Sequence, residues 1–480
     1  MWTWRWRSSR KRSYDAPLTK TKTKSLFAFS LLPAVLSLAW PTMLEQLMQT
    51  AVQYIDTAMV GSLGTQATAA VGSTPTVNWL IGSAVSAFGV GFLAMISQAL
   101  GAGETERARR TAAQAVLAVL LIGSLFTALT LGLSSQVPRW MQVDPAIRKS
   151  AGRYFFILYL PMLPRTASIL FGTVLRAAGD TKTPMRIGVR VNVLNVILNF
   201  LLIYPSREVQ LFGKLLPLWG AGWGVEGAAA ASALAFLFGG LAITAAFYRH
   251  PLISPRGRSL RPDMAVLRPC LRIALPNMLQ RFGTSLGYVA FAAMINSLGE
   301  ISTAAHTIAN TVESAFYIPG YGMQTAAATL TGNAIGAGDR QRRRDLARLI
   351  LLVEVSLMLL SGGLLFAFAP AMVSLFSPDA AVILLGSTVL RMVACSEPFY
   401  GVSIVTEGML QGAGRTAVPF LFNILGMWGV RIAGTYLCTQ VLGLGLVSSW
   451  GCMIGHNMLL FVLFVVYYAS GKWIPGEKSC

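Results

Sequence analysis

Charged side chains are scarce in this sequence of 480 residues, and acidic side chains are the scarcest. Asp, Glu, Lys and Arg together make up 12% of the chain, against about 25% in an ordinary soluble domain. Hydrophobic residues make up 54%, a balance typical of an integral membrane protein. The formal net charge of +20 is divided among short basic clusters between long apolar stretches and forms no continuous patch. We therefore expect no nucleic-acid partner.

Cysteine is also rare, with five residues and no CxxC spacing, so the sequence predicts neither a zinc site nor a disulfide framework. A cleavable signal peptide is not expected either. The first apolar stretch begins after Lys24 and continues to Gly61, much longer than the about 7 to 15 residues of a signal-peptide core. This stretch is therefore predicted to be the first membrane helix.

Apolar stretches long enough to cross about 30 Å of hydrocarbon recur along the whole chain. They lie near 31–61, 70–100, 111–133, 150–175, 185–204, 221–248, 266–297, 302–335, 346–369, 382–410, 418–440 and 443–469. The sequence thus predicts an all-α polytopic membrane protein with twelve transmembrane helices, whose main partner is the lipid bilayer.

The positions of Lys and Arg predict the orientation, because cytoplasmic loops retain positive charge. Basic residues gather in the N-terminal tail, at 107–110, 176–186, 249–268 and 340–344, and in the C-terminal tail. All these segments fall on one side of the predicted topology, whereas 62–69 and 440–444 lack such clusters. We expect a plasma-membrane protein with both termini in the cytoplasm. The Trp- and Arg-rich start reinforces this orientation as a disordered tail or docks onto anionic lipid.

The two halves of the chain are internal repeats of each other. A shift of 235 residues aligns Ala39–Arg110 with Ala274–Asp345 without a gap, and twenty positions are identical. The same shift matches LRAAGDTKTP, from Leu175, with LQGAGRTAVP, from Leu410. Chance matches would not keep one register across helices and loops, so the chain arose by duplication.

Each repeat contains six predicted spans, an even number, so the two halves share one orientation. They are expected to form two six-helix lobes related by pseudo-two-fold symmetry about an axis along the membrane normal, with a cavity between them. The Pro- and Gly-containing linker marks the boundary. The predicted organisation is a basic cytosolic tail at 1–30, an N-lobe at 31–248, a cytosolic linker at 249–265, a C-lobe at 266–470 and a cytosolic tail at 471–480.

Asp56 is the first candidate functional residue, because an ionisable side chain inside the bilayer costs about 2.5 to 3.5 kcal/mol. Asn195 and Asn199 lie with Asn192 on one face of the fifth predicted helix, and Asn199 is at the depth of Asp56. A carboxylate and amide oxygens could bind Na⁺, or the carboxylate could carry a proton in a poorly solvated pocket. Polar side chains of this type also join membrane helices without any ion, so a purely structural role stays open.

Three further carboxylates, Glu45, Glu313 and Glu397, are predicted near mid-membrane. We expect them to line the cavity between the lobes and attract a cationic substrate, with Tyr400 among the aromatic neighbours that supply contact area. Internal ion pairs are the alternative, because buried charges are tolerated mainly when paired. The arginines available inside predicted helices are Arg165, Arg190, Arg281, Arg391 and Arg431.

The order and spacing of several motifs resemble those of the multidrug and toxic compound extrusion (MATE) transporters over nearly the whole chain. In the first half these motifs are QYIDTAMVGSLG from Gln53, GAGETERARR from Gly101, LRAAGDTKTP from Leu175, NVLNVILNFLLIY from Asn192 and GVEGAAAASALAF from Gly224. In the second half they are AAHTIANTVESAFYIPGYGM from Ala304, GAGDRQRRRD from Gly336, SEPF from Ser396 and LQGAGRT from Leu410.

The resemblance implies positions for an ion site. Asp56, Asn195 and Ser232 match ion-site positions of related MATE transporters, and Asn199 stands where some relatives have an aspartate. The predicted fourth helix, 154–175, contains no asparagine, although one contributes there in the archaeal-type site. Both H⁺ and Na⁺ coupling therefore stay open, and Asp56, Asn195 and Asn199 are metal ligands only if the ion is Na⁺.

The sequence predicts a monomeric secondary antiporter, with no catalytic residues and no cofactor besides the coupling ion. As the resemblance implies, it would export small organic, cationic, drug-like compounds by alternating access of two lobes, driven by an inward H⁺ or Na⁺ gradient. One alternative is a lipid-linked saccharide flippase of related fold, in which membrane arginines would face an anionic pyrophosphate. The other is an intramembrane transferase, for which no paired-carboxylate metal motif is found on a loop.

Overall fold

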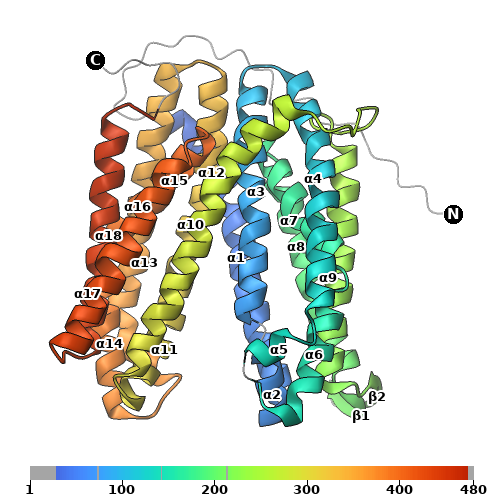
Figure 1. Ribbon diagram of the computed structural model, residues 1–480, viewed down its shortest axis with the longest axis vertical. Coiled ribbons are helices and arrows are strands. Elements are labelled where there is room, and N and C mark those ends of the chain that lie inside the picture. The colour runs from blue at the N-terminus through green and yellow to red at the C-terminus, as the bar shows by residue number, and fades with distance from the viewer. Residues whose placement is uncertain (1–28, 73–74, 142, 212–213, 474–480) are drawn as a thin grey trace.

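The computed structural model describes residues 29–72, 75–141, 143–211 and 214–473, and shows two groups of helices side by side (Figure 1). Nearly all of both predicted tails, 1–30 and 471–480, lies outside the described residues. The described chain is almost entirely helical, with one antiparallel hairpin, β1 Pro205–Leu211 and β2 Lys214–Ala221, that the sequence analysis did not predict. The fold is that of an all-helical polytopic membrane protein.

The N-lobe begins with a short 3₁₀ turn at Phe29–Leu31 and ends where α9 meets the linker. Its helices are α1 Leu32–Gly61, α2 Thr65–Gly72, α3 Pro75–Gly101, α4 Thr105–Gly132, α5 Val137–Trp140, α6 Pro145–Tyr159, α7 Met162–Ala177, α8 Lys182–Leu202 and α9 Gly224–Arg249. The hairpin β1–β2 connects α8 to α9.

The C-lobe follows the linker in the same order of long helices. It contains α10 Met264–Asn296, α11 Glu300–Phe316, α12 Ile318–Gly336, α13 Arg340–Ser374, α14 Ala380–Ala394, α15 Glu397–Gly412, α16 Ala417–Ile424, α17 Ala433–Tyr436 and α18 Leu446–Ala469. Two π-helical segments, η2 Leu425–Ile432 and η3 Leu437–Val441, make α16 and α17 parts of one continuous span at 417–441.

Eight described helices are long and apolar enough to cross a membrane, or ten if each of two bent pairs is one span. The pairs are α6 with α7, bent by 49°, and α14 with α15, bent by 54°. Both breaks coincide with proline, at Pro161 and Pro398, which lacks the N–H that helix continuation requires. The predicted number of twelve is not confirmed, because the helices at the predicted spans 266–297 and 302–335, which are α10 and the pair α11 and α12, are not among these candidates.

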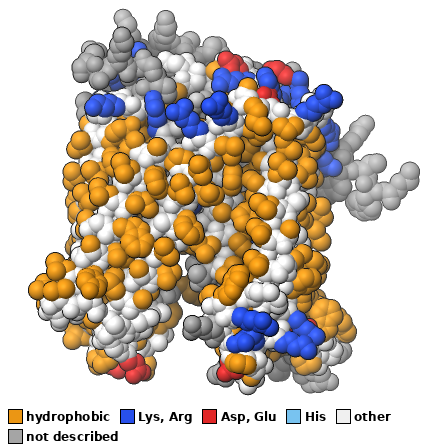
Figure 2. Space-filling model, viewed as in Figure 1, with side chains coloured by type: hydrophobic (Ala, Val, Ile, Leu, Met, Phe, Trp, Pro, Cys, Tyr) orange, Lys and Arg blue, Asp and Glu red, His pale blue; other side chains and the backbone are white. Residues whose placement is uncertain are grey.

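On the face shown in Figure 2, apolar side chains cover a broad band, with a row of Lys and Arg along one end and a smaller basic group at the other. The end with the row, here called the linker end, carries the linker at 250–263 (Figure 1). The opposite end, here called the hairpin end, carries β1 and β2. A wide belt of exposed apolar side chains is what a surface facing lipid tails requires.

The two lobes meet through α1 and α3 on one side and α10, α12 and α15 on the other. A Cβ atom at Gly101 would collide with the backbone of Asn333, and one at Gly336 with the carbonyl of Gln98, so only glycine permits this approach of α3 and α12. Gln98 also donates from Nε2 to the carbonyl of Gly412 at 2.8 Å. These contacts lie in the repeated GAG motifs, near the linker end.

The lobes diverge toward the hairpin end, where the surface is visibly split between them (Figures 1 and 2). The close glycine contacts therefore close the molecule at one end while the space between the lobes opens at the other. This arrangement has the form expected for one state of an alternating-access transporter.

Candidate functional site

Asp56 lies at one end of a chain of hydrogen bonds that joins three helices of the N-lobe. Its Oδ1 accepts a hydrogen bond from Nδ2 of Asn199 at 2.5 Å, which connects α1 to α8. Nδ2 of Asn199 also approaches Oδ1 of Asn195 at 3.3 Å, and Nδ2 of Asn195 donates to Oγ of Ser232 on α9 at 3.1 Å. All four residues predicted for ion coupling are thus neighbours in the structure.

The local sequence explains this geometry. Asn195 and Asn199 are four residues apart on one face of α8, and their side chains are only 5% and 1% exposed. Gly227 and Gly239 let α9 approach α8 closely, because a Cβ at either position would collide with Leu202 or Val191. Small residues therefore bring Ser232 within hydrogen-bond reach of Asn195.

The site has acceptor capacity left over. Oδ1 of Asn199 is buried and has no hydrogen-bond partner, and Asp56 forms no ion pair within the part of the chain that the structure describes. Asp56 itself is half-buried. A carboxylate, an amide oxygen and a hydroxyl oxygen are ligands that suit a hard cation, and the carboxylate alone can carry a proton. The residues present fit either ion.

Glu45 lies apart from this chain and is already paired. Both of its carboxylate oxygens accept hydrogen bonds from Nη2 of Arg176 on α7, at 2.8 and 2.7 Å, and the two side chains are 12% and 19% exposed. The pair satisfies both oxygens of the Glu45 carboxylate, whereas Nε of Arg176 is buried without a hydrogen-bond partner among the described residues. The role of Glu45 in substrate binding stays a prediction, but its charge is balanced in this state.

Glu313 and Tyr400 line a cavity of about 150 Å³ in the C-lobe, and Trp79 of α3 contributes from the N-lobe. Glu313 is 6% exposed, and within the described residues it forms no ion pair. The other lining residues include Gln280, Arg281, Tyr288, Tyr317, Tyr321, Glu407, Asn423, Arg431 and His456. The cavity therefore combines carboxylates, arginines and aromatic rings.

Glu397 is 1% exposed and lies at the bend between α14 and α15, not among the residues that line this cavity. Its Oε2 has no hydrogen-bond partner in the described part of the chain. The structure thus brings Glu313 and Tyr400 to one cavity and leaves Glu397 at the helix bend.

Two carboxylates of the C-lobe were not among the predicted site residues. Glu407 accepts hydrogen bonds from Gln280 at 2.9 Å, Gln411 at 3.0 Å and Asn423 at 3.2 Å. Glu354 is completely buried in α13, and neither of its oxygens has a hydrogen-bond partner among the residues that the structure describes. Glu354 stands alone in a long apolar run, and that isolation is the signal that could have identified it.

Three of the arginines predicted inside membrane helices, Arg165, Arg391 and Arg431, pack on aromatic rings. The guanidinium carbon of Arg165 lies 4.6 Å from the ring centre of Phe236 and 5.7 Å from that of Tyr159. The guanidinium carbon of Arg431 lies 4.2 Å from the ring centre of Phe291. Cation–π contacts of this kind hold a buried guanidinium without a carboxylate.

The chain is similar to known proteins over most of its length. The MatE family model matches residues 41–201 and 276–437, two segments whose starts differ by the shift found in the internal repeat. The probable multidrug resistance protein NorM of Thermotoga maritima is 26% identical over 440 residues, which cover 92% of each chain. The multidrug resistance protein PmpM of Pseudomonas aeruginosa is 24% identical and covers 84% of this chain and 83% of its own.

Solved structures agree in fold. A MATE family multidrug resistance transporter in the outward-facing conformation superposes with a TM-score of 0.82 at 22% identity, covering 90% of this chain and 94% of that chain. A transporter of the MOP superfamily from Pyrococcus furiosus, for which a binding pocket of reversed polarity is described, gives a TM-score of 0.81 at 24% identity and the same coverage. At this level of identity the likeness concerns the fold alone.

Proposed function

Because the chain belongs to the MatE family, whose members are membrane transporters and not enzymes, we propose that it exports small organic cations as an antiporter driven by an inward gradient of H⁺ or Na⁺. The multidrug efflux relatives support export of drug-like compounds. We further propose that it acts as a monomer in the plasma membrane, with both termini in the cytoplasm.

The observation that carries the proposal is the hydrogen-bond chain from Asp56 through Asn199 and Asn195 to Ser232. A carboxylate held by neutral amides inside a membrane helix can change its charge state without disrupting an ion pair. A proton or Na⁺ that binds Asp56 would neutralise the carboxylate and weaken its attraction for the amide of Asn199. The contact between α1 and α8 would then depend on the coupling ion.

Helix α1 can transmit this change to the C-lobe. Asp56 lies near the hairpin end of α1, whereas Thr42 lies nearer its other end and donates from Oγ1 to the carbonyl of Gly322 on α12 at 3.1 Å. Pro41 interrupts the hydrogen bonding of the helix beside this contact. One helix therefore touches both the ion-coupling residues and the opposite lobe.

The substrate is proposed to contact Glu313 and Tyr400, with Glu397 and Glu45 as further carboxylates that attract a cation. Carboxylates supply charge, and the tyrosine rings of the C-lobe cavity supply cation–π contact area. The cavity of about 150 Å³ is smaller than the roughly 300 to 1,000 Å³ of sites for drug-sized ligands. Binding of such a compound therefore requires the lobes or side chains to move apart.

Arg281 and Arg431 line the same cavity and favour a second candidate, a flippase for an anionic lipid-linked saccharide. Purified protein in liposomes can separate the two candidates by comparing a cationic dye with a polyprenyl-phosphate substrate. The antiporter proposal predicts dye transport only. Charge reversal with Arg281→Glu should leave dye transport in place, whereas loss of polyprenyl-phosphate movement in this variant would favour the flippase.

The decisive experiment for ion coupling imposes H⁺ and Na⁺ gradients separately on the same liposomes. Asp56→Asn should abolish gradient-driven dye export while folded protein remains in the membrane. The matched control is Glu104→Gln, which removes one carboxylate of the N-lobe that pairs with Arg107 at the surface. Full transport by Asp56→Asn would refute the assignment of the coupling site.

A further inference from the structure

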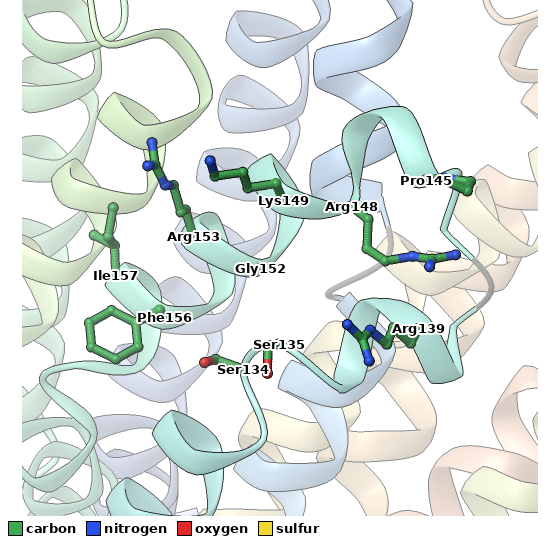
Figure 3. A pocket seen from close by; sticks show the side chains of 10 residues that line it. All are labelled: Ser134, Ser135, Arg139, Pro145, Arg148, Lys149, Gly152, Arg153, Phe156 and Ile157. Carbon is green, nitrogen blue, oxygen red and sulfur yellow. The ribbon is translucent and has the colours of Figure 1, made fainter.

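A second pocket lies in the N-lobe at the hairpin end, apart from all the residues discussed above. It has a volume of about 550 Å³ and lies between the turn at Ser134 and Ser135, helix α5 and helix α6 (Figure 3). Four basic side chains line it: Arg139 from α5, and Arg148, Lys149 and Arg153 from α6 (Figure 3). Such a concentration of positive charge requires an explanation.

Carboxylates in the neighbourhood balance only part of this charge. Arg153 pairs with Glu226 at 3.1 Å, but within the described part of the chain Arg139, Arg148 and Lys149 form no ion pair. Asp144 is the other carboxylate nearby, and its Oδ1 accepts the N–H of Ala146 at the start of α6. The pocket therefore keeps a surplus of positive charge.

The pocket is also partly preorganised. The guanidinium of Arg148 donates from Nε and Nη2 to the carbonyl of Val143, at 3.2 and 3.0 Å, which fixes the direction of this half-buried side chain. The side chains of Arg139 and Lys149 are exposed and make no hydrogen bond to described residues. One oriented guanidinium and two available cations are suited to a compact anion with several oxygens, such as a phosphate group.

The surroundings indicate where such an anion would come from. Phe156 and Ile157 form the apolar side of the pocket, and the neighbouring Leu160 and Trp140 are 57% and 65% exposed. Figure 2 shows this basic patch at the hairpin end of the N-lobe, at the edge of the apolar band. Aromatic side chains beside basic ones at this depth are typical of the zone where lipid headgroups lie.

We propose that this pocket binds the phosphate group of an anionic phospholipid from the leaflet at the hairpin end. The phosphate lies between Arg139, Arg148 and Lys149, and an acyl chain follows Phe156 and Ile157 toward the apolar band. The contact is electrostatic and geometric, with no covalent step. A free phosphate ion shares the charge but lacks the acyl chain, so it gains nothing from the apolar side of the pocket.

Photo-cross-linking of full-length purified protein in detergent tests this site directly. A photoreactive phosphatidylglycerol, an anionic lipid, should label the segment 134–157, and a photoreactive phosphatidylcholine at equal concentration should label it weakly. In Arg139→Gln/Lys149→Gln the concentration needed for labelling should rise about 30-fold, which equals about 2 kcal/mol for two cations near a membrane surface. Lys149→Gln alone is a milder second variant, with an expected rise of about fivefold.

The matched control is Arg342→Gln/Arg344→Gln, which removes the same charge from exposed positions at the linker end. Labelling of 134–157 should be unchanged in this variant. Equal labelling by the two lipids, or unchanged labelling in both pocket variants, would overturn the proposal. Displacement of the anionic lipid by an equal concentration of inorganic phosphate would also overturn it, because the pocket would then be an anion site without lipid preference.

Discussion

The side-chain amide of Asn199 donates a hydrogen bond to the carboxylate of Asp56 at 2.5 Å and so joins α8 to α1. Asn199 is 1% exposed, whereas Asp56 is half-buried, so the amide is fixed and the carboxylate remains accessible. An arrangement in which a fixed donor faces an accessible charge is suited to a site that an ion enters and leaves.

Removal of this donor should weaken ion coupling without unfolding the protein. Hydrogen bonds to charged groups contribute about 1.5 to 3 kcal/mol, so Asn199→Ala should slow gradient-driven dye export in liposomes roughly tenfold or more. Asn192→Ala is the control, since Asn192 is on the same helix and outside the hydrogen-bond chain. Equal slowing in both variants would indicate a general defect of α8.

The ion pair between Glu45 and Arg176 should respond differently to single and double substitution. Glu45→Gln or Arg176→Gln alone leaves a largely buried charge without its partner and should destabilise the protein by about 3 to 5 kcal/mol. The double variant removes both charges and should recover much of the loss. Thermal unfolding in detergent measures these losses of stability. A double variant whose loss equals the sum of the two single losses would contradict the pairing.

Substitution of glycine by alanine should have opposite effects on stability at a contact between the lobes and at an open position within a helix. Gly336→Ala places a Cβ against the carbonyl of Gln98 and should destabilise the closed contact by about 1 to 3 kcal/mol. Gly363→Ala, within α13, meets no neighbouring atom and should stabilise the helix by up to about 1 kcal/mol. The midpoints of thermal unfolding should move in opposite directions; an upward shift of both would show that helix propensity outweighs the collision at Gln98.

Substitution of two buried C-lobe carboxylates should show which of them contacts the substrate. Glu313→Gln removes a charge that lines the cavity, so the KM for export of a cationic dye should rise about tenfold. Glu354→Gln makes the same change at a buried position that does not line the cavity, and its KM should stay close to that of the original protein. A rise in KM for both variants would place the substrate elsewhere or make its binding indirect.

His250, which follows α9 at the start of the linker, should make stability depend on pH. Burial lowers the pKa of His250 in the folded protein, an effect that the nearby Asp180 partly opposes. Its Nδ1 accepts the N–H of Leu252 at 3.3 Å, which requires the neutral ring. Below about pH 6.5 the unfolded chain therefore binds the proton more readily, and stability should be present above this pH and lost as pH falls. His250→Gln should reduce the slope of unfolding temperature against pH between 7 and 5, and an unchanged slope would exclude His250 as its source.

Sequence patterns predicted the long helices well, because hydropathy directly reports which segments suit lipid. The stretch predicted at 31–61 corresponds to α1, Leu32–Gly61. The stretch predicted at 346–369 is shorter than α13, Arg340–Ser374. The first residues of α13 are basic, and they extend the helix beyond its apolar part. Hydropathy gives the apolar portion of a helix, and its caps determine the ends.

The stripe of Asn195 and Asn199 was also visible in the sequence, since residues four apart lie on one face of a helix. Which helices that face contacts was not visible. Equal depth pointed to Asp56, whereas Ser232 joined the site only through the family resemblance, and the hydrogen bonds of both residues required the structure. The pairing of Glu45 with Arg176, 131 residues apart, followed from no sequence pattern.

The sequence by itself determined the membrane class, the duplication and the family, because composition, a constant shift of 235 residues and ordered motifs are properties of the chain alone. The tertiary structure decided which charges are paired, where the lobes touch and how the halves differ. At the position that the repeat equates with Asp56, the C-lobe has Phe291, packed under Arg431. Duplication conserves helix order, but only packing in three dimensions determines which side chains meet.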